Sequence, residues 1–182
     1  MSAATSRRLL MIEQGGRGGV TDYTADLVGA IAAEGWAVTL ATADDHRFPH
    51  VDGVTVVPVF RYARGHSRLA RAARERGLGK VINGLRFLAA LPRLASLARN
   101  ADIVHSQGWE VAQLGPIALA CLRLTGTPVV QTEHGTFTRD ADELLGTSGA
   151  ARRLTGRLAA RTIVHTQADL ERVERRLTRR AP

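Results

Sequence analysis

Short apolar runs alternate with longer amphipathic stretches along this chain, and the two patterns predict different elements. The apolar runs predict six strands, at residues 8–12, 36–42, 54–60, 102–106, 128–132 and 162–165. A helix is predicted after the first strand, because Val20, Tyr23, Leu27 and Ile31 recur at helical spacing. Further helices are predicted at 67–76, 80–99 and 111–124 and after the last strand. We expect Pro92 to kink or break the longest of them.

The strands are separated by helices rather than by tight turns, which predicts right-handed βαβ crossovers. We therefore expect an α/β fold, a Rossmann-like three-layer sandwich with helices on both faces of a mostly parallel sheet of order 3-2-1-4-5-6. A capping box, Thr166-Gln167-Ala168-Asp169, is predicted at the start of the last helix. At 182 residues the chain has the size of one domain. Ligands of such sheets bind at the carboxyl ends of the strands, where the strand order reverses.

The first strand runs into a glycine cluster that a helix follows directly. Gly15, Gly16, Gly18 and Gly19 can adopt positive φ and let the backbone approach a ligand closely. The free N–H groups of the next helix, together with its dipole, favour negative charge. The cluster predicts a site for a phosphate-bearing ligand, and a purely structural turn is the alternative.

Other nucleotide and metal sites fit this sequence poorly. Thr21 stands where a nicotinamide-binding fingerprint needs its third glycine, and Asp44 is the only candidate for the ribose-binding carboxylate. No Gly-Lys-Ser/Thr follows the glycines, which excludes a P-loop. We interpret His46 and His50 as solvated loop residues rather than zinc ligands. Accordingly, we expect neither a bound metal nor a cofactor.

The formal net charge of +8 is carried almost entirely by arginine, which favours anionic partners. Nucleic acid is not expected, because aromatic residues make up only 4% of the chain and do not interleave with the arginines. Arg64, Arg68 and Arg71 belong to an arginine ridge at helical spacing, beside an apolar stretch that begins at Val81. The ridge predicts contact with an anionic membrane surface, and a solvated face is the alternative.

The remaining features predict a cytoplasmic protein, peripheral at the inner membrane face. The segment before Arg7 is small and polar, unlike a signal peptide. Charged residues and prolines interrupt the two most apolar helical stretches, around residues 81–98 and 111–124, so we expect neither stretch to span a bilayer. Cys121 is the only cysteine, so a buried thiol in a reducing compartment is expected.

Four segments in order carry a resemblance to a known family. They are Gly18-Gly19-Val20, residues 34–40, Ala101-Asp102-Ile103-Val104-His105-Ser106 and Pro128-Val129-Val130-Gln131-Thr132-Glu133-His134-Gly135. Together they resemble the amino-terminal domain of family-four, GT-B-type glycosyltransferases, over nearly the whole chain. The resemblance implies a retaining enzyme that transfers a sugar from a nucleotide-sugar donor to a lipid-linked, polyol or polysaccharide acceptor. It implies two Rossmann-like domains with the active site between them.

On this resemblance, residues 1–182 are the acceptor-side domain and the carboxyl-terminal donor-binding domain is absent from this chain. We therefore expect the isolated chain to be inactive. The alternative function is a non-catalytic domain of the same fold that binds a phosphate ligand or a membrane surface.

The resemblance also assigns roles to residues. Gly18 and Gly19 would face the donor diphosphate and the acceptor, with Gly15 and Gly16 as a flexible approach. His134 would contact the transferred sugar and is the expected catalytic residue. Further binding candidates at the strand ends are His105, Gln107 and Thr136. The family often has His-x-His where this chain has His105-Ser106-Gln107, so the second imidazole is missing.

Overall fold

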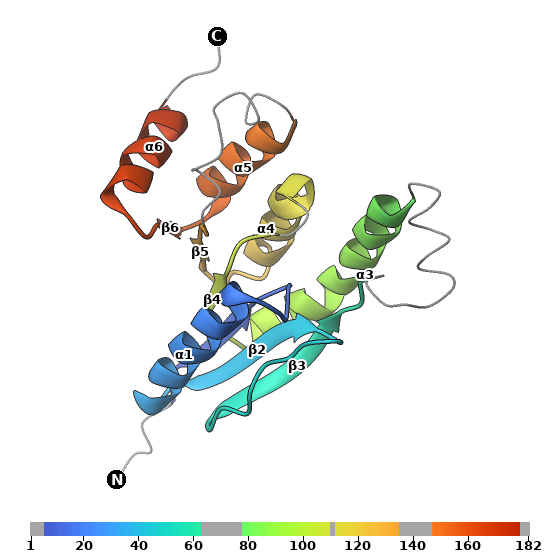
Figure 1. Ribbon diagram of the computed structural model, residues 1–182, viewed down its shortest axis with the longest axis vertical. Helices are drawn as coiled ribbons and strands as arrows, with labels where there is room; N and C mark the ends of the chain where they lie inside the picture. The colour runs from blue at the N-terminus through green and yellow to red at the C-terminus, as the bar shows by residue number, and fades with distance from the viewer. Residues whose placement is uncertain (1–5, 63–77, 110–111, 135–146, 179–182) are drawn as a thin grey trace.

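A computed structural model describes residues 6–62, 78–109, 112–134 and 147–178, and confirms the α/β sandwich (Figure 1). Six parallel strands form one sheet: β1 (Arg8–Ile12), β2 (Ala37–Ala43), β3 (Val54–Phe60), β4 (Ile103–Ser106), β5 (Val129–Thr132) and β6 (Arg161–Ile163). Their order is β3-β2-β1-β4-β5-β6, as predicted. The order reverses between β1 and β4, so the carboxyl ends of these strands are where a ligand site is expected.

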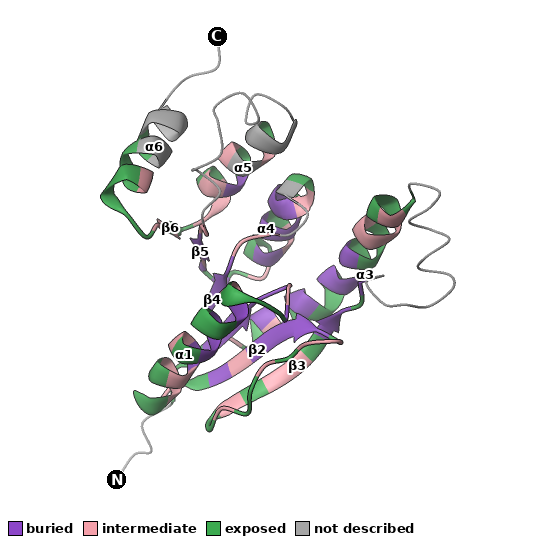
Figure 2. Ribbon diagram, viewed as in Figure 1, coloured by how far each residue is buried: buried purple, intermediate pink, exposed green. Residues whose placement is uncertain are grey.

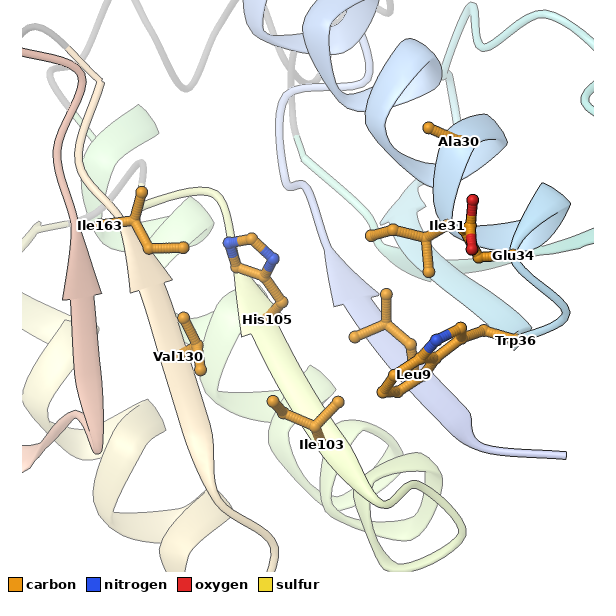
Figure 3. A pocket seen from close by; sticks show the side chains of 9 residues that line it. All are labelled: Leu9, Ala30, Ile31, Glu34, Trp36, Ile103, His105, Val130 and Ile163. Carbon is orange, nitrogen blue, oxygen red and sulfur yellow. The ribbon is translucent and has the colours of Figure 1, made fainter. Parts of the chain in front are cut away.

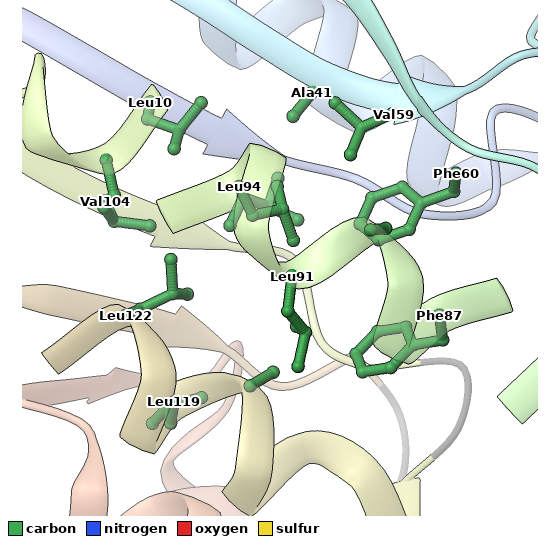
Figure 4. Close-up of a cluster of buried hydrophobic side chains, with 14 of the residues drawn as sticks. Leu10, Ala41, Val59, Phe60, Phe87, Leu91, Leu94, Val104, Leu119 and Leu122 are labelled. Carbon is green, nitrogen blue, oxygen red and sulfur yellow. The ribbon is translucent and has the colours of Figure 1, made fainter. Parts of the chain in front are cut away.

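The helices are α1 (Gly19–Ala33), α3 (Gly79–Arg99), α4 (Gly115–Arg123), α5 (Thr147–Leu158) and α6 (Gln167–Thr178), with the short 3₁₀ helix η1 (Ala112–Leu114) before α4. Neighbouring residues of β1 point to opposite faces of the sheet. Leu9 and Met11 pack against α1, whereas Leu10 and Ile12 belong to the larger core that α3 and α4 cover (Figure 4). The buried residues concentrate in the central strands and in the inner faces of α3 and α4 (Figure 2).

One prediction for the helices is narrowed, and one helix was not predicted. Of the two effects expected of Pro92, the structure excludes a break, because α3 is one helix from Gly79 to Arg99. Leu91 and Leu94 on either side of the proline are buried in the core, and this packing offsets the loss of one helical hydrogen bond. Helix α5 was not predicted, because its sequence is rich in arginine and small residues, and its fold depends on packing against α4.

The first bond of the predicted capping box, from the amide of Asp169 to the side chain of Thr166, is present at the start of α6. The amide of Asp169 donates to the hydroxyl of Thr166 at 3.1 Å, and that hydroxyl donates to the Asp169 carboxylate at 2.8 Å. The predicted helix at 67–76 lies outside the described residues.

Candidate functional site

The glycine loop, residues 15–19, follows β1 and is held by a buried carboxylate. The Glu13 side chain accepts hydrogen bonds from the amides of Gly15 at 2.9 Å and Gly16 at 2.6 Å. It also accepts a bond of 3.3 Å from the hydroxyl of Thr42. Because these amides point at a carboxylate that is part of the protein, they are engaged before any ligand arrives. Of the predicted glycines, Gly18 and Gly19 are therefore the better placed to meet an anion.

The start of α1 presents backbone amides without a side-chain cap. Gly18 is the N-cap residue, with φ of 83°, and no side chain of the described residues caps the helix. A methyl group placed on Gly18 or Gly19 would meet no atom within 4 Å, so the space in front of them is open. The hydroxyl of Thr21, in the first turn, is buried and has no hydrogen-bond partner among the described residues. This helix end has the amide and dipole chemistry of an anion site.

The outer side of the glycine loop is fixed to the loop that follows β2. The guanidinium of Arg17 contacts the carboxylate of Asp45 at 2.8 Å and donates to its backbone carbonyl as well. The carbonyl of Gly16 accepts a hydrogen bond of 2.7 Å from the amide of Arg47. Both contacts hold the glycine loop beside the second loop.

Polar side chains at the ends of β4, β5 and β6 form a second group, which we call the strand-end cluster: His105, Gln107, His134 and His165. His105 is 8% exposed, and its Nε2 lies 2.7 Å from the hydroxyl oxygen of Thr132. Burial, and secondarily the charge of His134, lower the pKa of His105 from 6.5 to about 4. His105 is therefore a neutral imidazole at physiological pH.

His134 lies in the middle of this cluster. Its Nε2 is 2.6 Å from the side-chain oxygen of Gln107, and its Nδ1 is 3.1 Å from Nε2 of His165. Because an amide oxygen only accepts, His134 donates from Nε2 and its Nδ1 accepts the proton of His165. Burial, followed by the charge of His165, holds the pKa of His134 below its usual value of 6.5. The imidazole of His134 is thus neutral and fixed in orientation.

Tyr23 connects the strand-end cluster to the start of α1. Its ring lies edge-on to His134, with centroids 5.1 Å apart, and edge-on to His165 at 5.5 Å. Tyr23 is one helical turn after Gly19, so the open helix end and His134 are neighbours. The structure thereby brings Gly18, Gly19, His105, Gln107 and His134 to one edge of the sheet. Thr136 lies outside the described residues, as do Arg64, Arg68 and Arg71.

His165 is the member of the cluster that sequence reasoning missed. A signal was available, because β5 and β6 were predicted as neighbours and each is followed by a histidine. The pairing of Thr132 with Ile163 places the two histidines at equivalent positions two residues further on. His46 and His50 stay apart from the cluster: the Nδ1 of His46 accepts from the amide of Phe48, and His50 pairs with Asp52. Within the described ranges no three His, Cys, Asp or Glu residues gather as a metal site.

An apolar groove of about 430 Å³ lies on the α1 side of the sheet (Figure 3). It is lined by Leu9, Ala30, Ile31, Glu34, Trp36, Ile103, His105, Val130 and Ile163. Only His105 belongs to both the groove and the strand-end cluster. The groove follows the sheet surface toward the amino ends of the strands, whereas the polar groups gather at the carboxyl ends. It is therefore distinct from the candidate site.

Comparisons with known proteins agree with this fold and identify a family. The sequence matches the glycosyl transferase 4-like domain over residues 18–182. No curated protein matches it. The fold is similar to that of Anabaena Alr3699/HepE in complex with UDP and glucose, with a TM-score of 0.56 and 17% identity over 95% of this chain and 42% of that chain. The same protein in complex with UDP gives a TM-score of 0.55 and 16% identity, over 95% and 41% of the two chains. This chain thus spans less than half the length of those structures.

Proposed function

The chain belongs to the glycosyl transferase 4-like domain family, and we propose that it is the acceptor-side domain of a retaining glycosyltransferase. The family and the GT-B fold of the similar structures support glycosyl transfer at a general level. The single observation that carries the specific proposal is the contact of Tyr23 with His134. It joins an uncapped helix end, suited to phosphate, to an imidazole suited to a sugar hydroxyl.

The proposed donor is a nucleoside diphosphate sugar, with a UDP-sugar as the first candidate because HepE is solved with UDP and glucose. The amides of the first turn of α1, in the open space beside Gly18 and Gly19, would hydrogen-bond the diphosphate. In the transfer, the bond from the anomeric carbon to the diphosphate breaks and a bond to an acceptor hydroxyl forms. The acceptor proton leaves with the diphosphate, and the helix dipole stabilises the charge that develops there.

His134 would contact the transferred sugar as a neutral hydrogen-bonding group. Its lowered pKa supports this role, because a neutral imidazole adds no positive charge beside a developing oxocarbenium-like carbon. His165 and Gln107 hold both ring nitrogens in defined directions, so they are proposed positioning residues. We expect no metal or further cofactor to take part.

The test is the turnover of the intact polypeptide that carries residues 1–182. The substitution His134→Ala should lower kcat by at least about tenfold, on the scale of a lost transition-state contact. His50→Ala is the matched control, because His50 is highly exposed and pairs with the likewise solvent-exposed Asp52. Equal turnover in His134→Ala and His50→Ala would contradict the catalytic role. Thermal unfolding of both variants checks that the fold is intact.

A second domain is part of the proposal, since HepE is more than twice the length that this chain covers. We propose that residues 1–182 alone bind a UDP-sugar weakly and form no product, because the second wall that excludes water and holds the nucleotide is missing. Isothermal titration with UDP-glucose, followed by product analysis with polyol, polysaccharide and lipid-linked acceptors, tests this. Robust turnover by residues 1–182 would refute it. Binding without turnover by the intact polypeptide would favour the non-catalytic alternative.

A further inference from the structure

Helix α3 has two apolar faces, and only one of them is used by the core. Phe87, Leu91 and Leu94 are buried against the sheet (Figure 4). On another face, four apolar residues are exposed to solvent: Leu78 by 49%, Val81 by 58%, Leu85 by 63% and Leu88 by 37%. We call these four residues the α3 stripe. Their spacing of three, four and three residues places them along one line of the helix.

The α3 stripe differs from the other exposed apolar residues of the described chain. Ile117 and Leu124, for example, are 49% and 89% exposed, but they are seven residues apart and only the small side chain of Ala120 is exposed between them on that face of α4. Single exposed apolar residues are normal on a protein surface, whereas a contiguous row indicates an interaction surface. The stripe has no role in the proposed sugar transfer.

The charges around the stripe indicate which partner it meets. Helix α3 carries Lys80, Arg86, Arg93 and Arg99 and has no acidic residue between Gly79 and Arg99. The guanidinium of Arg86 donates to the backbone carbonyl of Arg61 at 3.2 Å, which joins the exit of β3 to this basic region. An anionic surface complements this region.

We propose that the α3 stripe docks on an anionic membrane surface. The four apolar side chains enter the boundary between headgroups and acyl chains, and the flanking basic side chains meet lipid phosphates. A second copy of the chain is a poorer partner, because two stripes face to face would bring basic helices together with no acidic residue on either. The helix lies along the membrane rather than across it. By length and composition α3 could cross a membrane, since an 18-residue window of it has a mean hydropathy of 1.2. Its other face, however, is buried in the core.

The α3 stripe lies on a helix that is close to the candidate site, so docking would bring the site near the membrane. Phe87 of α3 stacks on Phe60, the last residue of β3, and lies edge-on to Trp109, with ring centroids 6.0 Å apart in both contacts. Trp109 follows Gln107 by two residues, so the middle of α3 is close to the site loop of β4. Under the proposed function, docking would favour a lipid-linked acceptor over a soluble one. The docking itself does not depend on that function.

Vesicle co-sedimentation tests the proposal with the full 182-residue chain. The chain should bind vesicles of phosphatidylcholine with phosphatidylglycerol, release them in high salt, and bind pure phosphatidylcholine at least about tenfold more weakly. The double variant Val81→Gln, Leu85→Gln should lose at least tenfold in affinity for the anionic vesicles. The matched double variant Ile117→Gln, Leu124→Gln changes two exposed apolar residues on α4 and at its end and should bind like wild type.

Two results would overturn the docking. One is equal vesicle binding by wild type and the Val81→Gln, Leu85→Gln variant, or no binding by wild type. The other is a dimer in light scattering that this variant alone dissociates, which would make the stripe a contact between copies. Circular dichroism checks that each variant is folded. Because the assay contains no donor sugar, its outcome is separate from that of the turnover test.

Discussion

The glycine loop and the strand-end cluster lie at the same edge of the sheet, yet they are held in different ways. The loop is anchored by charged groups, with the Glu13 carboxylate on two amides and Arg17 on Asp45. The cluster is held by imidazoles, which bond to Thr132, to Gln107 and to each other. One half of the site thus has its geometry set by fixed charge, and the other half has a geometry that depends on protonation. The glycine loop therefore gives the site its shape, and the histidines of the strand-end cluster are the groups within it that can respond to pH.

Removing the anchor of the glycine loop should have the largest effect. Glu13→Ala leaves the amides of Gly15 and Gly16 and the hydroxyl of Thr42 without their acceptor in a buried position. We expect the free energy of unfolding to fall by about 3 kcal/mol, measured by urea denaturation. Glu34→Ala is the control, since this glutamate is exposed and should cost far less. An equal loss in both variants would contradict the anchoring role.

Acid tests the strand-end cluster through two of its histidines. The folded state lowers the pKa of His105 to about 4, so between that value and 6.5 the unfolded state binds more protons. The contribution of neutral His105 to the free energy of unfolding is therefore fully present above pH 6.5. It is lost as the pH decreases toward 4, by about 2 kcal/mol between pH 7 and pH 5. The lowered pKa of His134 acts in the same direction.

Urea denaturation at pH 7 and pH 5 measures this effect. The variant His105→Gln keeps a group that can hydrogen-bond Thr132 but does not titrate, so most of the loss should disappear. If wild type and variant lose stability in parallel, His105 is not the source.

The smallest effect distinguishes two glycines of the loop. Gly16 and Gly18 both have positive φ, but a methyl group on Gly16 would lie 2.8 Å from Cβ of His46, whereas on Gly18 it would meet open space. Gly18→Ala should cost about 2 kcal/mol, because φ of 83° with ψ of −172° is a conformation that only glycine adopts readily, and Gly16→Ala about 1 kcal/mol more because of its steric contact. For affinity to UDP-glucose the order should reverse, because the methyl of Gly18→Ala occupies the proposed ligand space. Affinities that fall equally would argue against an anion site at Gly18.

The periodicity of apolar residues was enough to predict the fold. All six strands and their order follow from short apolar runs joined by helices, because a parallel sheet covered on both faces leaves few alternatives. Helix α5 was not predicted, because its stability comes from contacts with α4 rather than from the pattern of apolar residues in its own sequence. Helix α3 stayed whole at Pro92 for a similar reason, since packing outweighed local propensity.

The candidate site was less accessible to sequence reasoning. The edge of the sheet was predictable from the strand ends, and His134 and His105 are found there. The function of Glu13 was not, because it requires the chain to turn back so that a side chain meets the amides of residues two and three positions later. The ligand roles of the glycines, His105, Gln107 and His134 stay predictions that the binding and turnover experiments address.

The edge strand β6 determines how stable the contact between His165 and His134 is. Strand β6 has only three residues, lies at the edge of the sheet and carries no buried side chain. Such a strand opens locally more often than the buried central strands, on its own timescale and without global unfolding. Each opening would separate His165 from His134 while His105, on an inner strand, stays in position. We therefore expect the lifetime of the contact between His134 and His165 to be set by the opening rate of the edge strand rather than by the two histidines themselves.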